Sequence, residues 1–464
     1  MMDSIKSRIH RRVNLDNIRL RRMVYRSNYP ELRFKNIIID GANTQQQAYI
    51  KKEFHKSDNK EFSYEDLKQG YFRLLSDNMT SEIIPHAIYN PEDDTYDLHL
   101  KVKLENNFAV RLGGNISTSN SNQIYLGLSY QDLNYYAKEF VFDGQLGKVY
   151  NNAQFMAKID FSTAIPTSYR FIASISTFDY FKKDKLFSRN DKPAFNQKDE
   201  RFLKLQVGLP FLSSKRAEFG IGIARIEDKY FQKSVIDFGN DKFDKSRYDL
   251  FGGSISFNGS TLNSRQYPTR GYREALIAQI FIGRERFYPG ESATGNNNKE
   301  HHSWLQLSYM KEKYHNMSEH WVLGWYLKAL YASKNFSENY TATMMQAGEF
   351  SPTQHSKLTY NEAFRANQFV GAGIRPIYRL NQMFHLRGEF YGFMPIYPIE
   401  RNSLNKAYYG KAFSKFEYLG EISVVCQLPF GDISAYVNHY SSPKREWNVG
   451  LSIGWQLFNY RFIE

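Results

Sequence analysis

Apolar and polar residues alternate along most of the chain, and this pattern predicts β-strands from about residue 105 onward. A period of two is typical of a strand, because successive side chains point to opposite faces. In the last such segment one face is apolar and the other is small or polar. The apolar face carries Trp447, Val449, Leu451, Ile453, Trp455 and Leu457, and the other carries Asn448, Gly450, Ser452, Gly454 and Gln456. About sixteen comparable segments follow one another, without a convincing amphipathic helix among them.

The connections between these segments alternate in length. Short turns are predicted at Thr163–Ser168, Leu212–Ala217, Lys313–Glu319, Leu380–Gln382 and Leu428–Asp432. Long polar loops lie between them, at Phe181–Glu200, Glu227–Arg247, Gly283–His301, Lys334–Ala366 and Gly392–Ala412. Short turns at one end and long loops at the other are typical of transmembrane barrels, whereas a soluble sandwich has no reason to separate them. We therefore predict a mainly β fold, with a 16-stranded antiparallel transmembrane barrel over residues 105–464 and its apolar face toward outer-membrane lipid.

A smaller α+β domain is predicted ahead of the barrel, over residues 31–104. Its elements follow the order β-α-α-β-β. They are a strand at Leu32–Ile39, helices at Gln45–Phe54 and Ser63–Leu75, and strands at Glu82–Tyr89 and Tyr96–Leu104. Ser63, followed three residues later by Asp66, predicts an amino-terminal cap for the second helix.

Composition and charge exclude several classes of protein. The net charge is +13, from 61 Lys and Arg against 48 Asp and Glu, and aromatic residues make up 16% of the chain. Such aromatic content excludes a disordered chain, and one cysteine, Cys426, excludes an internal disulfide. Residues 1–30 are basic but lead into no nucleic-acid-binding module, so we interpret them as a solvated, partly helical connector and expect no nucleic-acid partner. They also lack the apolar core of a secretory signal.

Two motifs connect this barrel to a known superfamily. Gln266–Gly271 stands before the ninth predicted strand and reads Gln-Tyr-Pro-Thr-Arg-Gly. Through Tyr267, Pro268, Thr269 and Gly271 it resembles the F/Y-P-T-x-G motif of the BamA-like superfamily, which includes TamA and the two-partner secretion transporters.

The longest loop lies between the predicted strands eleven and twelve, where the superfamily has a loop that folds into the barrel. The family's loop tip is V/I-R-G-F/Y, and the matching stretch here is Phe364-Arg365-Ala366. The arginine is kept, whereas alanine replaces the glycine, which puts the tip's conformation in doubt.

The end of the last strand resembles the carboxy-terminal signal that the barrel assembly machinery reads in outer-membrane proteins. The matching residues are Asn448, Gly450, Ile453 and Trp455, and nine residues follow the tryptophan. The resemblance implies that this machinery is a partner of the chain.

One small domain before a 16-stranded barrel also resembles the POTRA domain and barrel of outer-membrane patatin-like phospholipases. That resemblance implies a translocator or anchor for a lipase domain, supplied in cis or by an adjacent gene, with the POTRA module in the periplasm. It implies that this chain, which lacks the catalytic domain, is a fragment or one product of a split gene. The alternative is a BamA/TamA-type factor that inserts or secretes other proteins.

We expect no catalytic, cofactor or metal site in the chain itself. Ser452 lies in the letters G-x-S-x-G but inside the last strand, with no helix after it, so it lacks the context of a nucleophile elbow. His439 and Ser441 resemble the His-x-Ser of a barrel-type phospholipase, without the Asn-Gly that follows it there. His301 and His302 are adjacent in a loop and form a weak metal motif.

The residues of most interest are charged ones expected in the lumen. In the predicted strand around 384–391, Arg387 and Glu389 share the face opposite the apolar one, and a bare charge in lipid is costly. We hypothesise that Arg365, at the tip of the inward loop, pairs with Glu389. The alternative is that Glu389 pairs within the wall, with Arg387 or Arg375.

Overall fold

The computed structural model describes most of the chain. The described residues are 15–27, 32–54, 61–76, 79–119, 122–162, 166–180, 196–212, 215–232, 242–291, 293, 297–442, 447–458 and 460–464. The first half of the basic connector and most of the predicted loop Phe181–Glu200 therefore lie outside the described residues. So do residues 163–165 and 213–214 of two predicted turns and 233–241 of the predicted loop at 227–247. The chain divides into two compact units: Met1–Glu105 with Leu133–Tyr135, and Asn106–Asp132 with Tyr136–Glu464.

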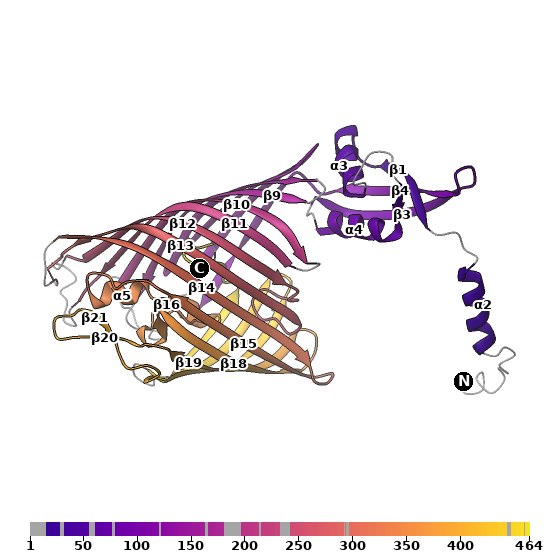
Figure 1. Cartoon of the computed structure of the whole chain (residues 1–464). Helices are drawn as coiled ribbons and strands as arrows, with labels where there is room; N and C mark the ends of the chain where they lie inside the picture. The colour runs from indigo at the N-terminus through magenta and orange to yellow at the C-terminus, as the bar shows by residue number, and fades with distance from the viewer. Residues whose placement is uncertain are drawn as a thin grey trace, which may run out of the picture. The chain divides into compact units, whose positions relative to one another are not determined.

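The first unit contains three described helices and a four-stranded sheet (Figure 1). Its elements are helix α2 (Leu15–Ser27), β1 (Arg33–Asp40), α3 (Thr44–Phe54), β2 (Phe62–Ser63), α4 (Tyr64–Ser76), β3 (Thr80–Asn90) and β4 (Thr95–Leu104). The sheet order is β2-β1-β4-β3, with β1 parallel to β4. The predicted order of elements is confirmed, with the two-residue strand β2 in addition. The predicted cap is confirmed too, because the backbone N–H of Asp66 donates to Ser63 Oγ (3.3 Å) and the backbone N–H of Ser63 to Asp66 Oδ2 (3.0 Å).

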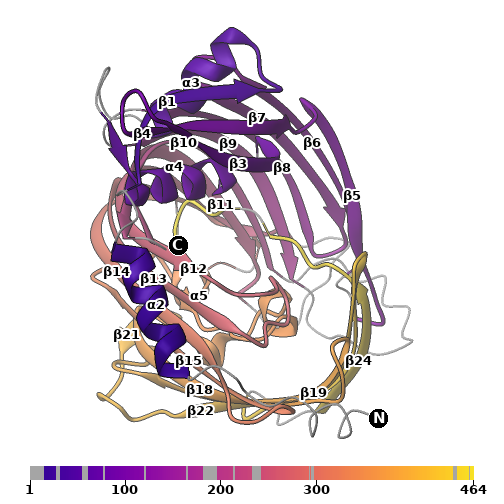
Figure 2. The same ribbon diagram turned by 90° about the vertical axis from the view of Figure 1, so that its right-hand side faces the viewer.

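The second unit is a closed barrel of sixteen strands (Figures 1 and 2). The strands are β5 (Phe108–Ser117), β6 (Gln123–Leu133), β7 (Ala137–Gly147), β8 (Tyr150–Phe161), β9 (Thr167–Tyr180), β10 (Asn196–Leu212), β11 (Lys215–Tyr230), β12 (Asp244–Ser260), β13 (Gly271–Tyr288), β14 (Asn298–Asn316), β15 (Trp321–Ala332), β18 (Gln368–Arg379), β19 (Phe384–Pro395), β22 (Glu417–Leu428), β23 (Gly431–Tyr440) and β24 (Trp447–Gly454). The predicted fold class is confirmed. Several strands extend beyond the sequence prediction into stretches expected as loops, most clearly β13 and β14. None of the described helices combines the length and apolar character needed to cross a membrane.

The wall is apolar outside and mostly polar inside. On β13, Ile280 and Ile282 are more than half exposed, whereas Gln279, next to Ile280, is buried. The same alternation confirms the two predicted faces of β24 as far as Ile453. An exposed apolar belt of this kind suits a wall surrounded by lipid, and the buried polar residues then line the lumen.

The long connection between β15 and β18 folds into the lumen. It contains α5 (Tyr340–Gln346), β16 (Gly348–Glu349), the 3-10 helices η1 (His355–Leu358) and η2 (Glu362–Phe364), and β17 (Arg365–Ala366). Gln346 donates to Asp228 on β11 (2.6 Å), and His355 bonds with Glu421 on β22 (2.9 Å). The inward loop, as we call residues 333–367, therefore reaches both sides of the barrel. Its predicted place between strands eleven and twelve is confirmed.

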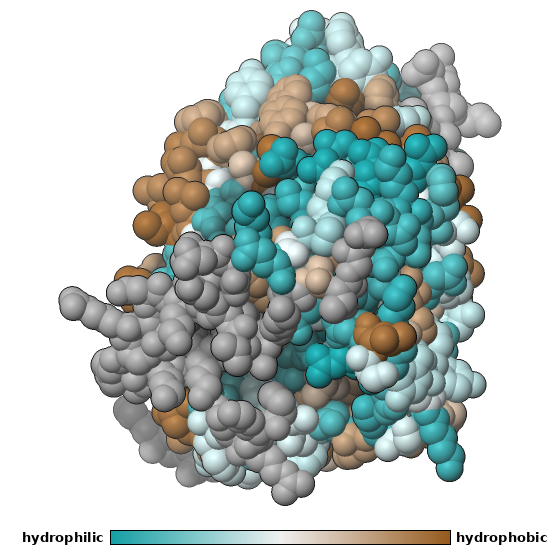
Figure 3. Space-filling model, turned by 90° about the vertical axis from the view of Figure 1, so that its left-hand side faces the viewer, coloured by the Kyte–Doolittle hydropathy of each residue, from teal (hydrophilic) through white to brown (hydrophobic). Residues whose placement is uncertain are grey.

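The end of the barrel that carries the long connections is mainly hydrophilic. Figure 3 shows teal residues over much of this end, with brown residues gathered toward its periphery. A second hairpin lies between β19 and β22, made of β20 (Ile399–Arg401) and β21 (Ala407–Tyr409). Polar loops over an apolar wall are the layout that a transmembrane barrel requires.

Candidate functional site in the barrel lumen

The turn before β13 has a geometry that its sequence dictates. Gly271 has φ +93°, and a Cβ there would lie 2.1 Å from the carbonyl oxygen of Thr261. Only glycine adopts this conformation without strain, and only glycine fits so close to the neighbouring backbone. The side-chain oxygen of Asn263 accepts bonds from the N–H groups of Thr269 (3.0 Å) and Arg270 (2.9 Å). The motif therefore forms a fixed turn.

This turn enters the lumen and forms hydrogen bonds with strands that come much later in the chain. The hydroxyl of Tyr267 donates to Ser434 Oγ on β23 (3.0 Å), and Gln427 on β22 donates to the carbonyl of Tyr267 (3.1 Å). Arg387 on β19 donates to the carbonyl of Pro268 (2.8 Å). The motif thus links β13 with three of the last strands of the barrel, in addition to the contacts through the wall.

Glu389 lies at the centre of a buried charge network in the lumen. Arg387 Nε donates to its carboxylate, and Arg375 Nε lies 3.5 Å from Glu389 Oε2. Arg375 also pairs with Glu312 on β14 and donates to the hydroxyl of Tyr391 (2.6 Å). Two buried carboxylates therefore face two buried guanidiniums, so each charge is compensated where solvation is poor.

The hypothesis that Arg365 pairs with Glu389 is wrong. Arg365 Nη2 instead lies 2.8 Å from Glu349 Oε2, its register partner in the β16–β17 hairpin, and its guanidinium stacks over Tyr360 at 4.7 Å. The inward loop itself supplies the counter-charge for Arg365, so its guanidinium is compensated without a carboxylate from the barrel wall. The alternative is the one observed, since Glu389 pairs with Arg387 and Arg375.

The barrel closes along a short seam between β24 and β5. The two strands form ladder pairs at Ser452–Ser117, Ile453–Ile116 and Gly454–Asn115, and the N–H of Thr118, just after β5, donates to the carbonyl of Leu451 (2.9 Å). By contrast β5 pairs with β6 from Phe108–Tyr130 to Asn115–Gln123. Among the described residues, the edge of β5 over 108–113 therefore forms ladder pairs on the β6 side alone. The side chains of Phe108, Val110 and Leu112 on this stretch are more than half exposed.

The seam is short because the chain leaves the wall after Gly454. Gly454 has φ +113°, and a Cβ there would lie 2.1 Å from the carbonyl oxygen of Gly114. The N–H of Trp455 still donates to that oxygen (2.7 Å), and the following residues turn into the lumen. The prediction that Trp455 and Leu457 continue the outer face of the last strand is therefore wrong.

The residues of the predicted assembly signal differ in their positions. Ile453 faces outward, and Asn448 lies on the opposite face, donating to Asn438 (3.1 Å). Gly450 is buried where a Cβ would lie 2.4 Å from the ring of Tyr436. Trp455 lies beyond the end of the strand. Whether assembly machinery reads these residues stays a prediction.

The serine and histidine candidates have other partners. Ser452 Oγ donates to Asn115 across the seam (2.6 Å). Ser441 Oγ donates to Glu417 and accepts from the N–H of Tyr418 (3.0 Å), whereas the ring of His439 stacks on Trp447 at 4.6 Å. These contacts give the seam hydroxyl and the strand-end histidine structural roles.

One group of described residues has the geometry to hold a divalent cation. The ligand atoms of Glu285, Glu300 and His302 all lie within 4.8 Å of one another. His302 Nε2 already bonds to Glu285 Oε2 at 2.9 Å, which accounts for their positions without a metal. The adjacent His301 is exposed on the other face of β14, so the two histidines do not share a site.

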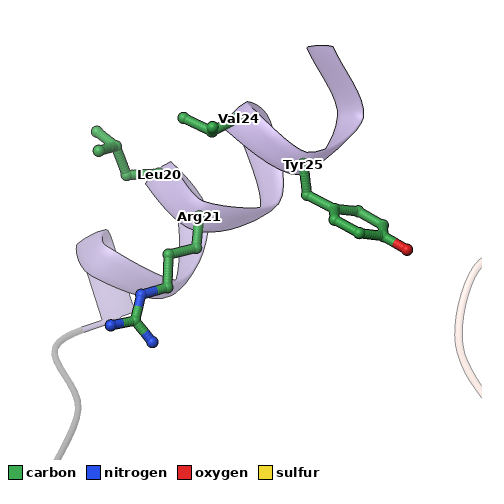
Figure 4. Close-up of a pocket in the computed structure, with 4 residues that line it drawn as sticks. All are labelled: Leu20, Arg21, Val24 and Tyr25. Atoms are coloured by element: carbon green, nitrogen blue, oxygen red, sulfur yellow. The ribbon is translucent and has the colours of Figure 1, made fainter. Parts of the chain in front are cut away.

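A shallow hollow on helix α2 is lined by Leu20, Arg21, Val24 and Tyr25 (Figure 4). All four residues come from one helix, and they bring together a single guanidinium with apolar side chains. The hollow offers no set of groups for catalysis.

The comparisons with known proteins agree with this architecture. No family model matches the chain, and no curated protein matches it. Among solved structures, BamA from Haemophilus ducreyi lacking POTRA domains 1–3 superposes with a TM-score of 0.60 at 12% identity, covering 91% of this chain and 84% of that chain. The barrel has the BamA-type fold. CdiB from Acinetobacter baumannii and CdiB from Escherichia coli each give a TM-score of 0.52, at 9% and 11% identity. They cover 92% of this chain, and 74% and 76% of their own.

Sequence reasoning missed the contacts that hold the BamA-type lumen together. It named the turn motif and Glu389 separately, but Arg387, which joins them through Pro268, was only an alternative partner. The alternation of β19 did place Arg387 inside, so the signal was present. The turn at Gly454 was hidden, because the apolar alternation of the letters continues past it.

Proposed function

We propose that this chain is a bacterial outer-membrane barrel that inserts or translocates other polypeptides, with its small domain acting as a POTRA-like module in the periplasm. The observation that carries the proposal is the short seam between β24 and β5. An unpaired strand edge is a ready template for a strand from another chain. The edge of β5 at 108–113 offers such a template beside the exposed apolar side chains of the wall.

The electrostatics of the lumen support the same proposal. The charge network around Glu389 and the turn at Tyr267 tie β13 and β14 to β19, β22 and β23 without help from the seam. The strands next to the seam are therefore held through the lumen. Opening the seam would leave these contacts in place.

The fold likeness supports the architecture on which this proposal rests, but it does not identify a cargo. The BamA and CdiB structures share the barrel at low identity, so their likeness supports the fold and leaves insertion and secretion as two forms of one proposal. Depletion of this protein in its host tests it. We expect a defined set of outer-membrane or secreted proteins to decline, and an unchanged outer-membrane and secreted proteome would contradict the proposal.

The finer proposal is that the barrel anchors or exports a lipase domain, from the same or an adjacent gene. It is supported by the single small domain before the barrel and by the resemblance to patatin-like phospholipases. Outer membranes run boiled and unboiled on a gel, blotted against residues 447–458, test it. A heat-modifiable band well above 54.5 kDa would support an attached domain, and one at that mass would limit the chain to the barrel and its small domain.

We propose no catalytic step for the chain itself. Lipase activity of the purified barrel, lost in Ser441→Ala, would contradict that view. An insertion or translocation factor needs only strand edges, a lumen and a membrane-facing wall.

A further inference from the structure

The segment after β24 crosses the barrel lumen in an extended path. We call residues 455–458 and 460–464 the lumenal segment. Figure 2 shows this yellow trace inside the ring of strands, and Figure 1 places its end within the barrel. Its residues meet successive strands of the wall, from Trp455 beside β5 to Glu464 beside β13 and β14.

Glutamine side chains of the wall bind the main chain of this segment. Gln123 on β6 donates to the carbonyl of Leu457 and accepts from its N–H, both at 3.1 Å. Gln279 on β13 donates to the carbonyl of Phe462 (3.1 Å) and accepts from the N–H of Glu464 (3.0 Å). Each amide thus satisfies one donor and one acceptor of an extended chain, as a neighbouring strand would.

Two further wall residues complete this main-chain recognition. Glu200 on β10 accepts from the N–H of Phe462 (2.6 Å), and Gln306 on β14 donates to the main-chain oxygen of Glu464 (2.5 Å). Glu200, Gln279 and Gln306 are all more than nine-tenths buried. Because these bonds go to backbone atoms, they do not depend on the sequence of the occupant.

An apolar pocket receives the side chain of Phe462, which is 3% exposed. Its ring lies 5.9 Å from that of Phe202 and 5.7 Å from that of Phe281. Two glycines make room for it: a Cβ on Gly222 would lie 2.9 Å from the ring, and one on Gly252 would lie 3.1 Å away. Phe462 covers this apolar part of the lumen wall and keeps it out of water.

Charged groups flank this pocket on both sides. Arg461 lies over the ring of Phe178 at 4.6 Å and lies 3.8 Å from Glu349 of the inward loop. Glu464 lies 3.9 Å from Lys204 on β10. The site therefore selects a basic residue followed by an aromatic one, with an acidic group two positions later.

We infer that this track is a binding site for an extended peptide, and that the lumenal segment occupies it in cis. Its ligand is a polypeptide in extended conformation with an aromatic side chain next to a basic one, recognised mainly through its main chain. This inference goes beyond the proposed function. Its test measures peptide binding to the barrel directly, so the result does not depend on which cargo the chain handles.

The test is peptide binding to the chain ended after Trp455, purified in detergent. A fluorescent peptide with the sequence of residues 456–464 should bind this shortened chain saturably. Binding should weaken at least tenfold when the phenylalanine at position 462 is alanine, and the full chain should not bind because its site is filled. Absence of binding to a shortened chain that keeps its heat-modifiable mobility would overturn the inference. So would equal binding to the full chain.

A second pair of variants keeps the full length, in case shortening prevents folding. Phe462→Ala removes the buried anchor, whereas Tyr460→Ala removes an aromatic side chain of the same segment that is 47% exposed. We expect the first to gain at least tenfold in peptide binding over the unaltered chain and the second to gain none. Equal behaviour of the two variants would contradict the pocket for Phe462.

Discussion

The seam of this barrel has far fewer strand pairs than the wall opposite it. β13 and β14 pair without interruption from Gly271–Tyr314 to Phe287–Asn298, whereas β24 and β5 pair at three positions. Main-chain pairing is the principal bond between strands, so the wall is strong by itself and the seam is not. The difference teaches that the seam is the place where this wall is easiest to open. The strands before it, β19, β22 and β23, are also held to β13 and β14 through the lumen.

The largest expected effect comes from breaking the lumenal charge network. Arg387 is 1% exposed, and Arg387→Ala leaves Glu389 with one guanidinium fewer and frees the carbonyl of Pro268. Breaking a buried ion pair costs about 3–5 kcal/mol. We expect the free energy of unfolding in denaturant to fall by about that amount.

The matched control is an exposed ion pair of the wall, between an arginine and an aspartate. Arg225 lies 2.6 Å from Asp249 with more than half of its side chain exposed. Arg225→Ala should cost about 0–1 kcal/mol. If both variants lose the same stability, the lumenal network has no special role in holding the seam-side strands.

The next effect concerns the residue that ends the seam. Gly454→Ala places a Cβ against the carbonyl of Gly114 at a positive φ. Strain of this kind costs about 1–3 kcal/mol, and the displaced chain should also lose pairing at the seam. Hydrogen exchange of the β5 amides should rise. Gly420→Ala is the control, because the nearest atom to its Cβ would be 3.6 Å away. Unchanged exchange in Gly454→Ala would show that the seam does not depend on the turn.

A smaller effect is expected from the turn motif. Tyr267→Phe removes the buried hydrogen bond to Ser434 and leaves a hydroxyl unsatisfied, which costs about 1–2 kcal/mol. In a double-mutant cycle, Ser434→Ala should recover part of that loss when combined with Tyr267→Phe. Strictly additive losses would mean that the hydrogen bond contributes nothing across the lumen.

Much of this fold could be predicted from sequence because period-two patterns are local. The strand at Trp447–Gly454 follows from residues close together in the chain, whereas the turn motif at Gln266–Gly271 and the inward loop were expected from the resemblance to the superfamily. The mainly β class and the sixteen strands need only this local information.

Pairings across the lumen could not be predicted in the same way. Arg365 was expected to pair with Glu389, and only the three-dimensional structure shows that Glu349, sixteen residues earlier, lies opposite it in a hairpin. The inward turn at Gly454 was equally hidden, since a glycine on the lumen face of a strand also suits a straight strand. Such contacts depend on how distant segments meet.

The most direct test of the weak seam is a pair of disulfides. Ser117→Cys with Ser452→Cys locks the seam, and Asn152→Cys with Ser176→Cys locks a register pair between β8 and β9. Both are made with Cys426→Ser, and paired positions in antiparallel strands suit a disulfide. The measurement is the level of the proteins that decline when this chain is depleted. The account predicts that the oxidised seam lowers them and reductant restores them, whereas the wall disulfide has no effect. Normal levels with a fully oxidised seam would contradict it.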